Sequence, residues 1–213
     1  MLFDLMSFQN LTRITCLVCG FFFFNSGICQ IVPSANTLVK NLEIGDWILR
    51  KGTTADSMII GFVGNSRFSH IGIISSLKPE AKIIHAMTDS NGEHGSVRET
   101  TLEKFVSSDR SNIAVIIRPA FLTALQKKTV VESIRLQIGL PFILAERHEQ
   151  HRYCTTLIAD ATSKVEPSFV PSWTYLNVPF FIGEYLFPDA FINYPNTVCV
   201  MQIQGGKYSQ ECK

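Results

Sequence analysis

Two short apolar stretches decide the fold: FSHIGIIS at residues 68–75 and KIIHA at residues 82–86. Both are rich in β-branched residues, and the Lys78-Pro79-Glu80 segment between them predicts a turn, so we expect them to form a β-hairpin. Each strand carries one histidine, His70 or His85. Because facing side chains of an antiparallel pair lie about 5 Å apart, we expect the two imidazoles to lie side by side, where they suit either a metal site or a base with an orienting partner.

The remaining chain predicts further strands and helices around this hairpin. Strands are expected over 47–49, after a turn at Gly45-Asp46, and over 113–117. Helices are expected over 122–138 and 154–164, with a short helix beginning within 101–106, and residues 58–63 fit either a helix end or a strand. The C-terminal third is rich in proline and aromatic residues. This order of strands, two helices and an aromatic extension predicts an α+β domain.

Composition narrows the classes of function. The 213 residues include 19 Lys+Arg and 18 Asp+Glu, a net charge of +1, so no basic excess supports binding of nucleic acid. A hydrophobic fraction of 46% is too high for a disordered chain. The length gives room for one domain with one core.

The N-terminal segment has the pattern of an export signal. An apolar run over 14–24 follows Arg13 and precedes Asn25, Ser26 and Gly27. This run is too short to span a bilayer as a helix but matches the apolar part of a signal peptide. We therefore expect residues 1–34 to be a signal peptide or an N-terminal anchor, and the protein to be exported to the periplasm or cell envelope of a bacterium. A buried N-terminal helix is the alternative.

Six cysteines are present, and three of them lie within the first 30 residues. In an oxidising compartment, Cys199 and Cys212 could form a disulfide around a short loop that contains Gly205 and Gly206. Cys154 would then be the odd thiol, which makes it a candidate for chemistry. It opens the helix predicted over 154–164, where the positive end of the helix dipole favours a thiolate, and a neighbouring imidazole would favour it further. The alternative is a small buried residue.

Five motifs in this order resemble a known family of hydrolases. The chain is similar to the YiiX/YaeF-type papain-like hydrolases, the circularly permuted branch of the NlpC-type cysteine peptidase superfamily, which is related to lecithin:retinol acyltransferase. The resemblance covers residues 42–165. The motifs are GDWILR at 45–50, FSHIGI at 68–73, IIHA at 83–86, GLPF at 139–142 and YCTTL at 153–157.

The resemblance implies a circularly permuted papain-like (NlpC-type) fold, with an antiparallel sheet packed against helices, over residues 35–213. It implies that Cys154 is the nucleophile, His70 the general base, and His85 the third polar residue, where this branch often has glutamate. The backbone N–H of Cys154 and one further donor would hold the oxyanion. No metal and no other cofactor is expected.

Five further residues are candidates for shaping the substrate pocket, and each also suits a purely structural role. Phe142 stands in a Pro-Phe-Ile segment where the family commonly has Pro-Tyr-Asp, which predicts a changed pocket floor. Arg50 belongs to the first of the five motifs and fits an ordinary surface charge equally well. The other three candidates are Tyr153, Asp46 and Trp173.

The function predicted from these residues is a cysteine-nucleophile amidase or peptidase that acts through an acyl-thioester on a peptide or acyl-amide of the cell envelope. Proximity to a membrane is expected, and no partner protein is indicated. One alternative is a lipid-directed thiol acyltransferase or esterase, in which the aromatic residues of the C-terminal third line an acyl pocket: Trp173, Tyr175, Phe180, Phe181, Tyr185 and Phe187.

Two further alternatives keep the fold but change the chemistry. A metal-dependent hydrolase would use His70 and His85 with His148 or His151, whose spacing in the sequence suits one face of a helix. A binding protein would use the aromatic pocket without catalysis. His94 lies in a polar loop and is expected to be exposed.

Overall fold

The computed structural model describes residues 40–53, 64–88, 95–205 and 207–209. All of them belong to one compact unit, Val32–Lys213. The predictions for residues 1–34 and 58–63, and those for His94 and Cys212, lie outside these ranges. Within them, no helix is long and apolar enough to cross a membrane.

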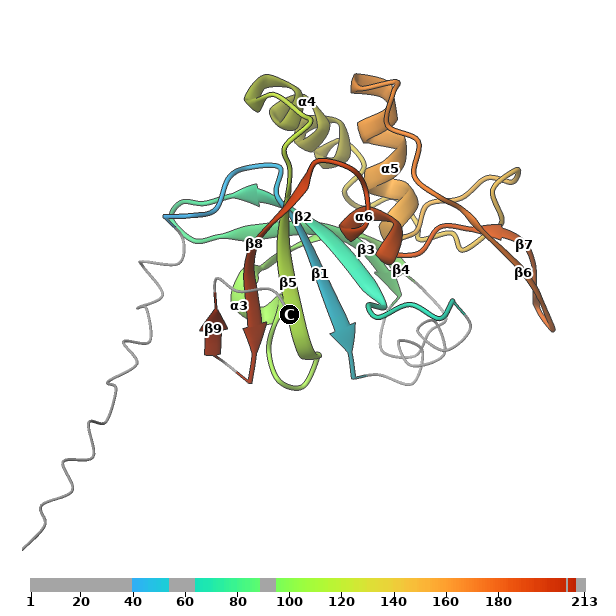
Figure 1. Ribbon diagram of the computed structural model, residues 1–213, viewed down its shortest axis with the longest axis horizontal. Coiled ribbons are helices and arrows are strands. Elements are labelled where there is room, and N and C mark those ends of the chain that lie inside the picture. The colour runs from blue at the N-terminus through green and yellow to red at the C-terminus, as the bar shows by residue number, and fades with distance from the viewer. Residues whose placement is uncertain (1–39, 54–63, 89–94, 206, 210–213) are drawn as a thin grey trace, which may run out of the picture. The chain divides into compact units, whose positions relative to one another are not determined.

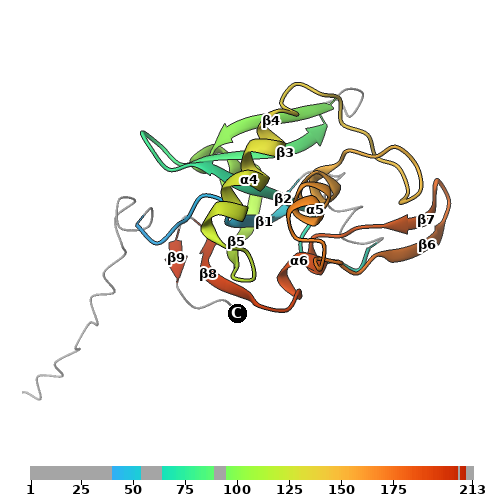
Figure 2. The same cartoon turned by 90° about the horizontal axis from the view of Figure 1, so that it is seen from above.

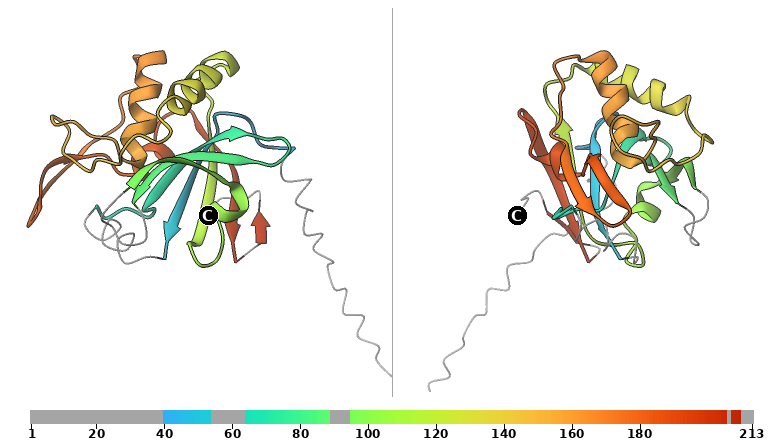
Figure 3. Two further views of the ribbon diagram at one scale, coloured as in Figure 1. Left: turned by 180° about the vertical axis from the view of Figure 1, so that it is seen from behind. Right: turned by 90° about the vertical axis from the view of Figure 1, so that its right-hand side faces the viewer.

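A seven-stranded antiparallel sheet forms the centre of this unit (Figure 1). Its strand order is β4-β3-β2-β1-β5-β8-β9, so the hairpin of β2 and β3 lies beside the first strand of the chain. A second sheet consists of β6 and β7 and extends away from the first (Figure 3). The strands are β1 (Trp47–Gly52), β2 (His70–Ser76), β3 (Lys82–Thr88), β4 (Gly95–Thr101), β5 (Ser111–Pro119), β6 (Thr174–Val178), β7 (Phe181–Tyr185), β8 (Thr197–Gln204) and β9 (Lys207–Ser209).

Helices cover both faces of the main sheet. The helices α4 (Ala124–Arg135) and α5 (Cys154–Val165) lie side by side over one face, on β2 (Figure 2). The short helix α3 (Leu102–Phe105) packs against the opposite face, and α6 (Asp189–Ile192) precedes β8. The fold is therefore α+β, as predicted.

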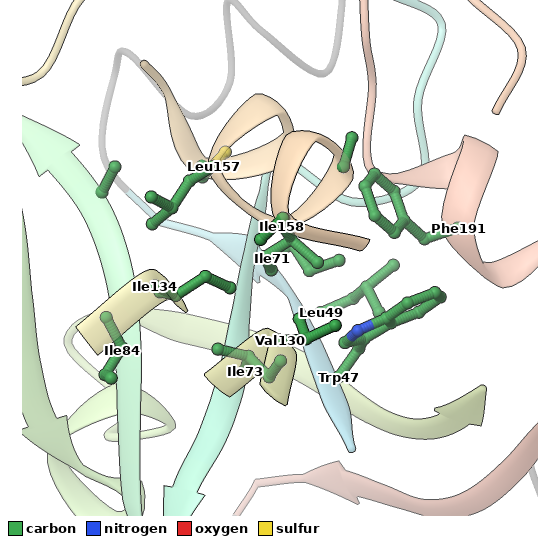
Figure 4. Packing of buried hydrophobic residues seen from close by; sticks show 14 of the residues in the cluster. Trp47, Leu49, Ile71, Ile73, Ile84, Val130, Ile134, Leu157, Ile158 and Phe191 are labelled. Carbon is green, nitrogen blue, oxygen red and sulfur yellow. The ribbon is translucent and has the colours of Figure 1, made fainter. Parts of the chain in front are cut away.

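Alternation along the strands builds two cores, because successive side chains point to opposite faces. On the α4/α5 face, strand residues such as Ile71 and Ile73 pack against Val130, Ile134 and Leu157 of the helices (Figure 4). On the α3 face, a second apolar cluster includes Ile48, Ile74, Ile83 and Phe105.

The predicted hairpin is confirmed, as are the strands over 47–49 and 113–117, the short helix within 101–106 and the helix that begins at Cys154. The first long helix is shorter than the predicted 122–138: a capping box between Thr123 and Gln126 starts it, and it ends at Arg135. Single turns then lead to Gly139, whose φ of 89° ends the right-handed coil.

Strands β4, β6, β7, β8 and β9 and the short helix α6 were not predicted from the sequence. The segment GSVRETT of β4 contains a single fully buried residue, Val97, so it carries little apolar alternation. The strand β8 pairs with β5 and extends the main sheet, which makes the C-terminal third part of the core rather than only an extension.

Candidate active site

Two imidazoles face each other on the α3 face of the sheet. Nε2 of His70 lies 2.8 Å from Nδ1 of His85, and the two rings meet edge to face. Both side chains are buried, with 8% of His70 and 2% of His85 exposed. The structure thus brings together the two histidines that the hairpin was expected to place side by side.

Phe105, the last residue of α3, packs against both imidazoles. Its ring centroid lies 5.6 Å from that of His70 and 5.2 Å from that of His85. The guanidinium of Arg50 lies over the same ring, 4.5 Å from its centroid, and donates a hydrogen bond from Nη1 to the Phe105 carbonyl. The ring can approach because a Cβ at Gly72 would already lie 3.3 Å from it. A single aromatic residue, which the sequence analysis did not single out, therefore orients three polar side chains.

Positive charge surrounds the histidine pair. Arg50 on β1 is the register partner of His70, and Arg98 on β4 is the register partner of His85. Burial, together with the charges of Arg50, Arg98 and Arg110, lowers the pKa of His85 to about 3. Burial, Arg50 and His85 lower the pKa of His70 well below its ordinary value. Both imidazoles are therefore neutral at pH 7.

Arg50 is itself perturbed by its surroundings. It is 6% exposed, and burial followed by the charge of Arg110 lowers its pKa to about 10. The guanidinium still carries its charge at neutral pH, so a buried cation lies beside the two histidines. The sequence interpretation of Arg50 as an ordinary surface charge is wrong, because the alternation along β1 turns it inward beside Phe105.

Cys154 is the first residue of α5 and is 9% exposed. Burial raises the pKa of its thiol to about 11, whereas the backbone N–H groups of Ile71 and Thr155 and the charge of Arg50 act in the opposite direction. The helix N-terminus thus lowers the thiol pKa, as expected. Desolvation raises the pKa by more, so the resting side chain is a neutral thiol. The thiol lies against the backbone of Ile71, on the α4/α5 face of the sheet. The ring of the preceding residue, His70, points to the opposite face, where it packs against Phe105.

The hydrogen bond between the rings determines which nitrogen of His70 is free to act as a base. Nε2 of His70 is engaged by His85, so Nδ1 of His70 is the nitrogen available to accept a proton. In that state the His70 ring carries its own proton on Nε2 and donates it to Nδ1 of His85. The proton of His85 is then on Nε2, a buried atom with no hydrogen-bond partner in the described part of the chain.

The aromatic pocket candidates lie around the start of α5. The hydroxyl of Tyr153 accepts a hydrogen bond of 2.9 Å from the N–H of Leu186, and burial raises the pKa of Tyr153 above its ordinary value. Trp173 is half-buried, with its ring centroid 5.8 Å from that of His151. Phe142 packs against the edge of the core on the α4/α5 face. Tyr153 therefore ties the helix that carries the thiol to the segment after β7.

Asp46 is not near the histidine pair. It is fully buried just before β1, where Nε and Nη2 of Arg118 each donate to it at 2.8 Å and the N–H of Glu43 does the same. Four residues along a strand separate it from Arg50, which is about 13 Å. Its position is that of a structural ion pair that holds the turn before β1.

A metal centre on the histidines does not fit this arrangement. Two nitrogens that bind one zinc ion at about 2.0–2.1 Å in tetrahedral geometry lie roughly 3.3 Å or more apart, whereas Nε2 of His70 and Nδ1 of His85 are at hydrogen-bond distance. His148 is in an exposed turn and Nε2 of His151 lies 3.6 Å from Asp160, so the helical spacing predicted for them is not formed. The described residues contain no group of three or more His, Cys, Asp or Glu side chains that could hold a metal ion.

The antiparallel sheet, with two helices on one face and the histidine-bearing hairpin beside the first strand, is a YiiX-type fold. The chain is similar to the crystal structure of the metalloprotein YiiX from Escherichia coli O157:H7, with a TM-score of 0.64 over 77% of this chain and 99% of that chain, at 15% sequence identity. No family model matches the chain, and no curated protein matches it. The likeness shows the fold alone.

Proposed function

We propose that the protein is a cysteine hydrolase of the amidase or peptidase type, acting through an acyl-thioester. The observation that carries this proposal is the position of one free thiol, Cys154, at the N-terminus of a helix and against the backbone of Ile71. The residue before Ile71 is His70, whose Nε2 is held by His85. A nucleophile, a base and an orienting group in this order are the parts that acyl transfer requires.

The proposed reaction requires the His70 ring to reach the Cys154 thiol around the start of β2. Nδ1 of His70 then takes the thiol proton as sulfur attacks the substrate carbonyl. The backbone N–H of Cys154, at the positive end of α5, stabilises the oxyanion that forms. The C–N bond then breaks and the leaving amine takes the proton from His70. Water, deprotonated by the same nitrogen, attacks the thioester, and the thiol regains its proton as the acid leaves.

His85 acts on the base rather than on the substrate. It accepts the Nε2 proton of His70, which fixes the tautomer that leaves Nδ1 free. A neutral imidazole stabilises an imidazolium less than a carboxylate does. We therefore expect slower chemistry than a glutamate at this position would support.

The proposed substrates are peptides or acyl-amides of the bacterial cell envelope, with the protein exported and close to a membrane. One feature supports an oxidising compartment: Cys199 is disulfide-bonded, and its predicted partner, Cys212, lies outside the described residues. Cys154 is then the free thiol of the described chain.

A lipid-directed acyltransferase or esterase is the second candidate, and one observation favours it. The β6–β7 hairpin presents uncharged apolar side chains to solvent, with Phe180 96%, Tyr175 66% and Ile182 64% exposed. Tyr175 and Phe180 were expected from the sequence to line an acyl pocket. Both are exposed instead, so they do not line an internal pocket. Such a hairpin suits contact with an acyl chain or a lipid surface.

The similar structure is called a metalloprotein by its own description. The histidines of this chain do not offer a metal site in the described residues, so the metal-dependent hydrolase is not our proposal. A direct check is metal analysis of the purified protein: stoichiometric zinc that disappears in His70→Ala would favour the metal reading over the thiol one.

The decisive experiment uses an acyloxymethyl ketone probe and intact-protein mass spectrometry on the folded protein. We expect one adduct, on Cys154, which is absent in Cys154→Ala and forms at least tenfold more slowly in His70→Ala. Lys51→Gln, on an exposed neighbour of the site, is the control and should react as the wild type does. Equal labelling rates for the wild type and His70→Ala would leave a binding protein as the better account.

A further inference from the structure

Three buried N–H donors on the α3 face of the sheet have no acceptor in the described chain. They are Nε of Arg50, Nε of Arg98 and Nε2 of His85, which carries a proton in the tautomer that the proposed reaction needs. A buried donor without a partner destabilises the folded state, because its hydrogen bonds to water are lost and not replaced. An acceptor that binds among them would remove this destabilisation.

These donors lie on neighbouring strands and on one face. Arg50 is on β1 and His85 on β3, while Arg98 is opposite His85 on β4. The two arginines start about three strand spacings apart, roughly 14 Å, so their long side chains flank the histidine pair from either side. The charges of both act on His85, as does that of Arg110.

Within the described ranges, no carboxylate forms an ion pair with the arginines of this cluster, Arg50 and Arg98. The carboxylate that acts on Arg50 is Asp109, whose side chain is 73% exposed and lies 3.7 Å from Arg110. Other partly buried arginines of the chain are paired: Arg118 with Asp46 and Glu43, and Arg135 with Glu99.

We propose that this cluster, Arg50, His85 and Arg98, binds an oxyanion of the substrate, a carboxylate or a phosphate, on the α3 face of the sheet. Guanidinium groups bind such oxyanions through paired hydrogen bonds, and an oxyanion supplies acceptors for all three donors. Arg98 is half-buried and the Arg110 side chain is 36% exposed, so the anion enters from their side. This inference rests on the proposed function for its substrate and deepens it.

The binding test uses inorganic phosphate and acetate with Cys154→Ala protein, at an ionic strength held constant with sodium chloride. We expect a saturable rise in melting temperature and a binding isotherm by calorimetry, with affinity at least tenfold weaker after Arg98→Gln. Lys51→Gln is the matched control, because it removes the same charge from an exposed neighbour of Arg50. Arg50→Lys, which keeps the charge but loses the paired donors, should also weaken binding. Absence of saturable binding, or equal affinities in Arg98→Gln and Lys51→Gln, would overturn the site.

The substrate test compares pairs that differ in charge. Mono-p-nitrophenyl succinate is set against p-nitrophenyl butyrate, and a lysophosphatidylglycerol against a monoacylglycerol, so that carboxylate and phosphate sources are distinguished. We expect kcat/KM to favour the anionic member of at least one pair by tenfold or more, and Arg98→Gln to abolish this preference. Turnover of charged and neutral members at equal rates refutes the anion site and leaves the proposed hydrolase standing. Phosphate or acetate binding without any turnover refutes the hydrolase and leaves the site standing.

Discussion

Cys154 shows how two opposing effects on one side chain are decided by magnitude. The N-terminus of a helix typically contributes 0.3–1 kcal/mol to a neighbouring anion, less than one pKa unit, which is 1.36 kcal/mol. Burial costs the thiolate more, and the pKa rises to about 11. The position of the cysteine in the sequence predicted the favourable effect, but the extent of burial depends on packing against β2 and could not be predicted.

A high thiol pKa has a direct kinetic consequence. Because the thiolate is the species that reacts, the rate of Cys154 alkylation by iodoacetamide should rise about tenfold per pH unit between pH 7 and 10. The measurement is the rate of carbamidomethylation by mass spectrometry, with glutathione as the reference thiol. A rate that is constant between pH 6 and 8 would instead indicate a preformed thiolate–imidazolium pair.

His85 should make the fold acid-sensitive. Its pKa is lowered to about 3 in the folded protein, against about 6.5 when unfolded. The unfolded chain therefore binds more protons below pH 6.5, so stability is full above that value and is lost as the pH falls toward 3. Between pH 7.5 and 5 this amounts to about 2 kcal/mol of unfolding free energy.

Urea unfolding at the two pH values measures this loss. His85→Gln should reduce the difference between them, whereas His148→Gln, which changes an exposed histidine, should leave it unchanged. An identical difference in wild type and His85→Gln would show that His85 does not titrate as described.

A substitution at Asp46 should affect the stability of the fold but not the reactivity of Cys154. Asp46→Asn leaves Arg118 without its buried counter-charge, which should lower the unfolding free energy by about 2–3 kcal/mol. The rate of Cys154 alkylation in the folded protein should stay within twofold of wild type, because Asp46 lies at the far end of β1 from Arg50. A tenfold loss of alkylation rate at full stability would place Asp46 in the site after all.

At the scale of elements, the site depends on how α3 sits on the hairpin. Phe105 contacts both histidines and Arg50, and it reaches them over Gly72. The sequence predicted the hairpin and its two histidines, because alternation and turn residues are local signals. It did not predict the role of Phe105, since nothing local shows which strand a four-residue helix will cover.

Gly72→Ala tests this packing. The added Cβ would lie 2.4 Å from Cγ2 of Ile83, so one of the strands or Phe105 must shift. We expect a loss of about 1–3 kcal/mol in unfolding free energy and a change in the alkylation rate of Cys154. Ser76→Ala, at the end of the same strand, is the control, and equal stability of the two variants would mean that the ring does not need the glycine.

At the scale of the whole molecule, the proposed site draws on parts that are distant in sequence. The hairpin supplies His70 and His85, β1 and β4 supply the two arginines, and α5 supplies Cys154. The five motifs could be recognised in the sequence in their order along the chain. The strands that complete the main sheet could not all be predicted. The strand β8 was missed because it has only two fully buried residues, Met201 and Ile203, and the rest of the strand carries little apolar alternation.

Expression with the native N-terminus in a bacterial host tests export and redox state together. We expect a periplasmic product that lacks about the first 34 residues by N-terminal sequencing. Non-reducing peptide mapping should find Cys199 joined to Cys212, and Cys154 unmodified. A cytosolic product that retains the N-terminal segment would contradict the predicted export.

The burial of Cys154 also bears on how well its thiol would survive in the oxidising compartment that we propose. Peroxides and stray disulfides attack thiolates, and an accessible, acidic cysteine there is readily converted to sulfenic acid or a mixed disulfide. A thiol that is 9% exposed and protonated at neutral pH is shielded from both. The same desolvation that would slow the proposed attack on a substrate thus keeps the thiol chemically intact in an oxidising environment.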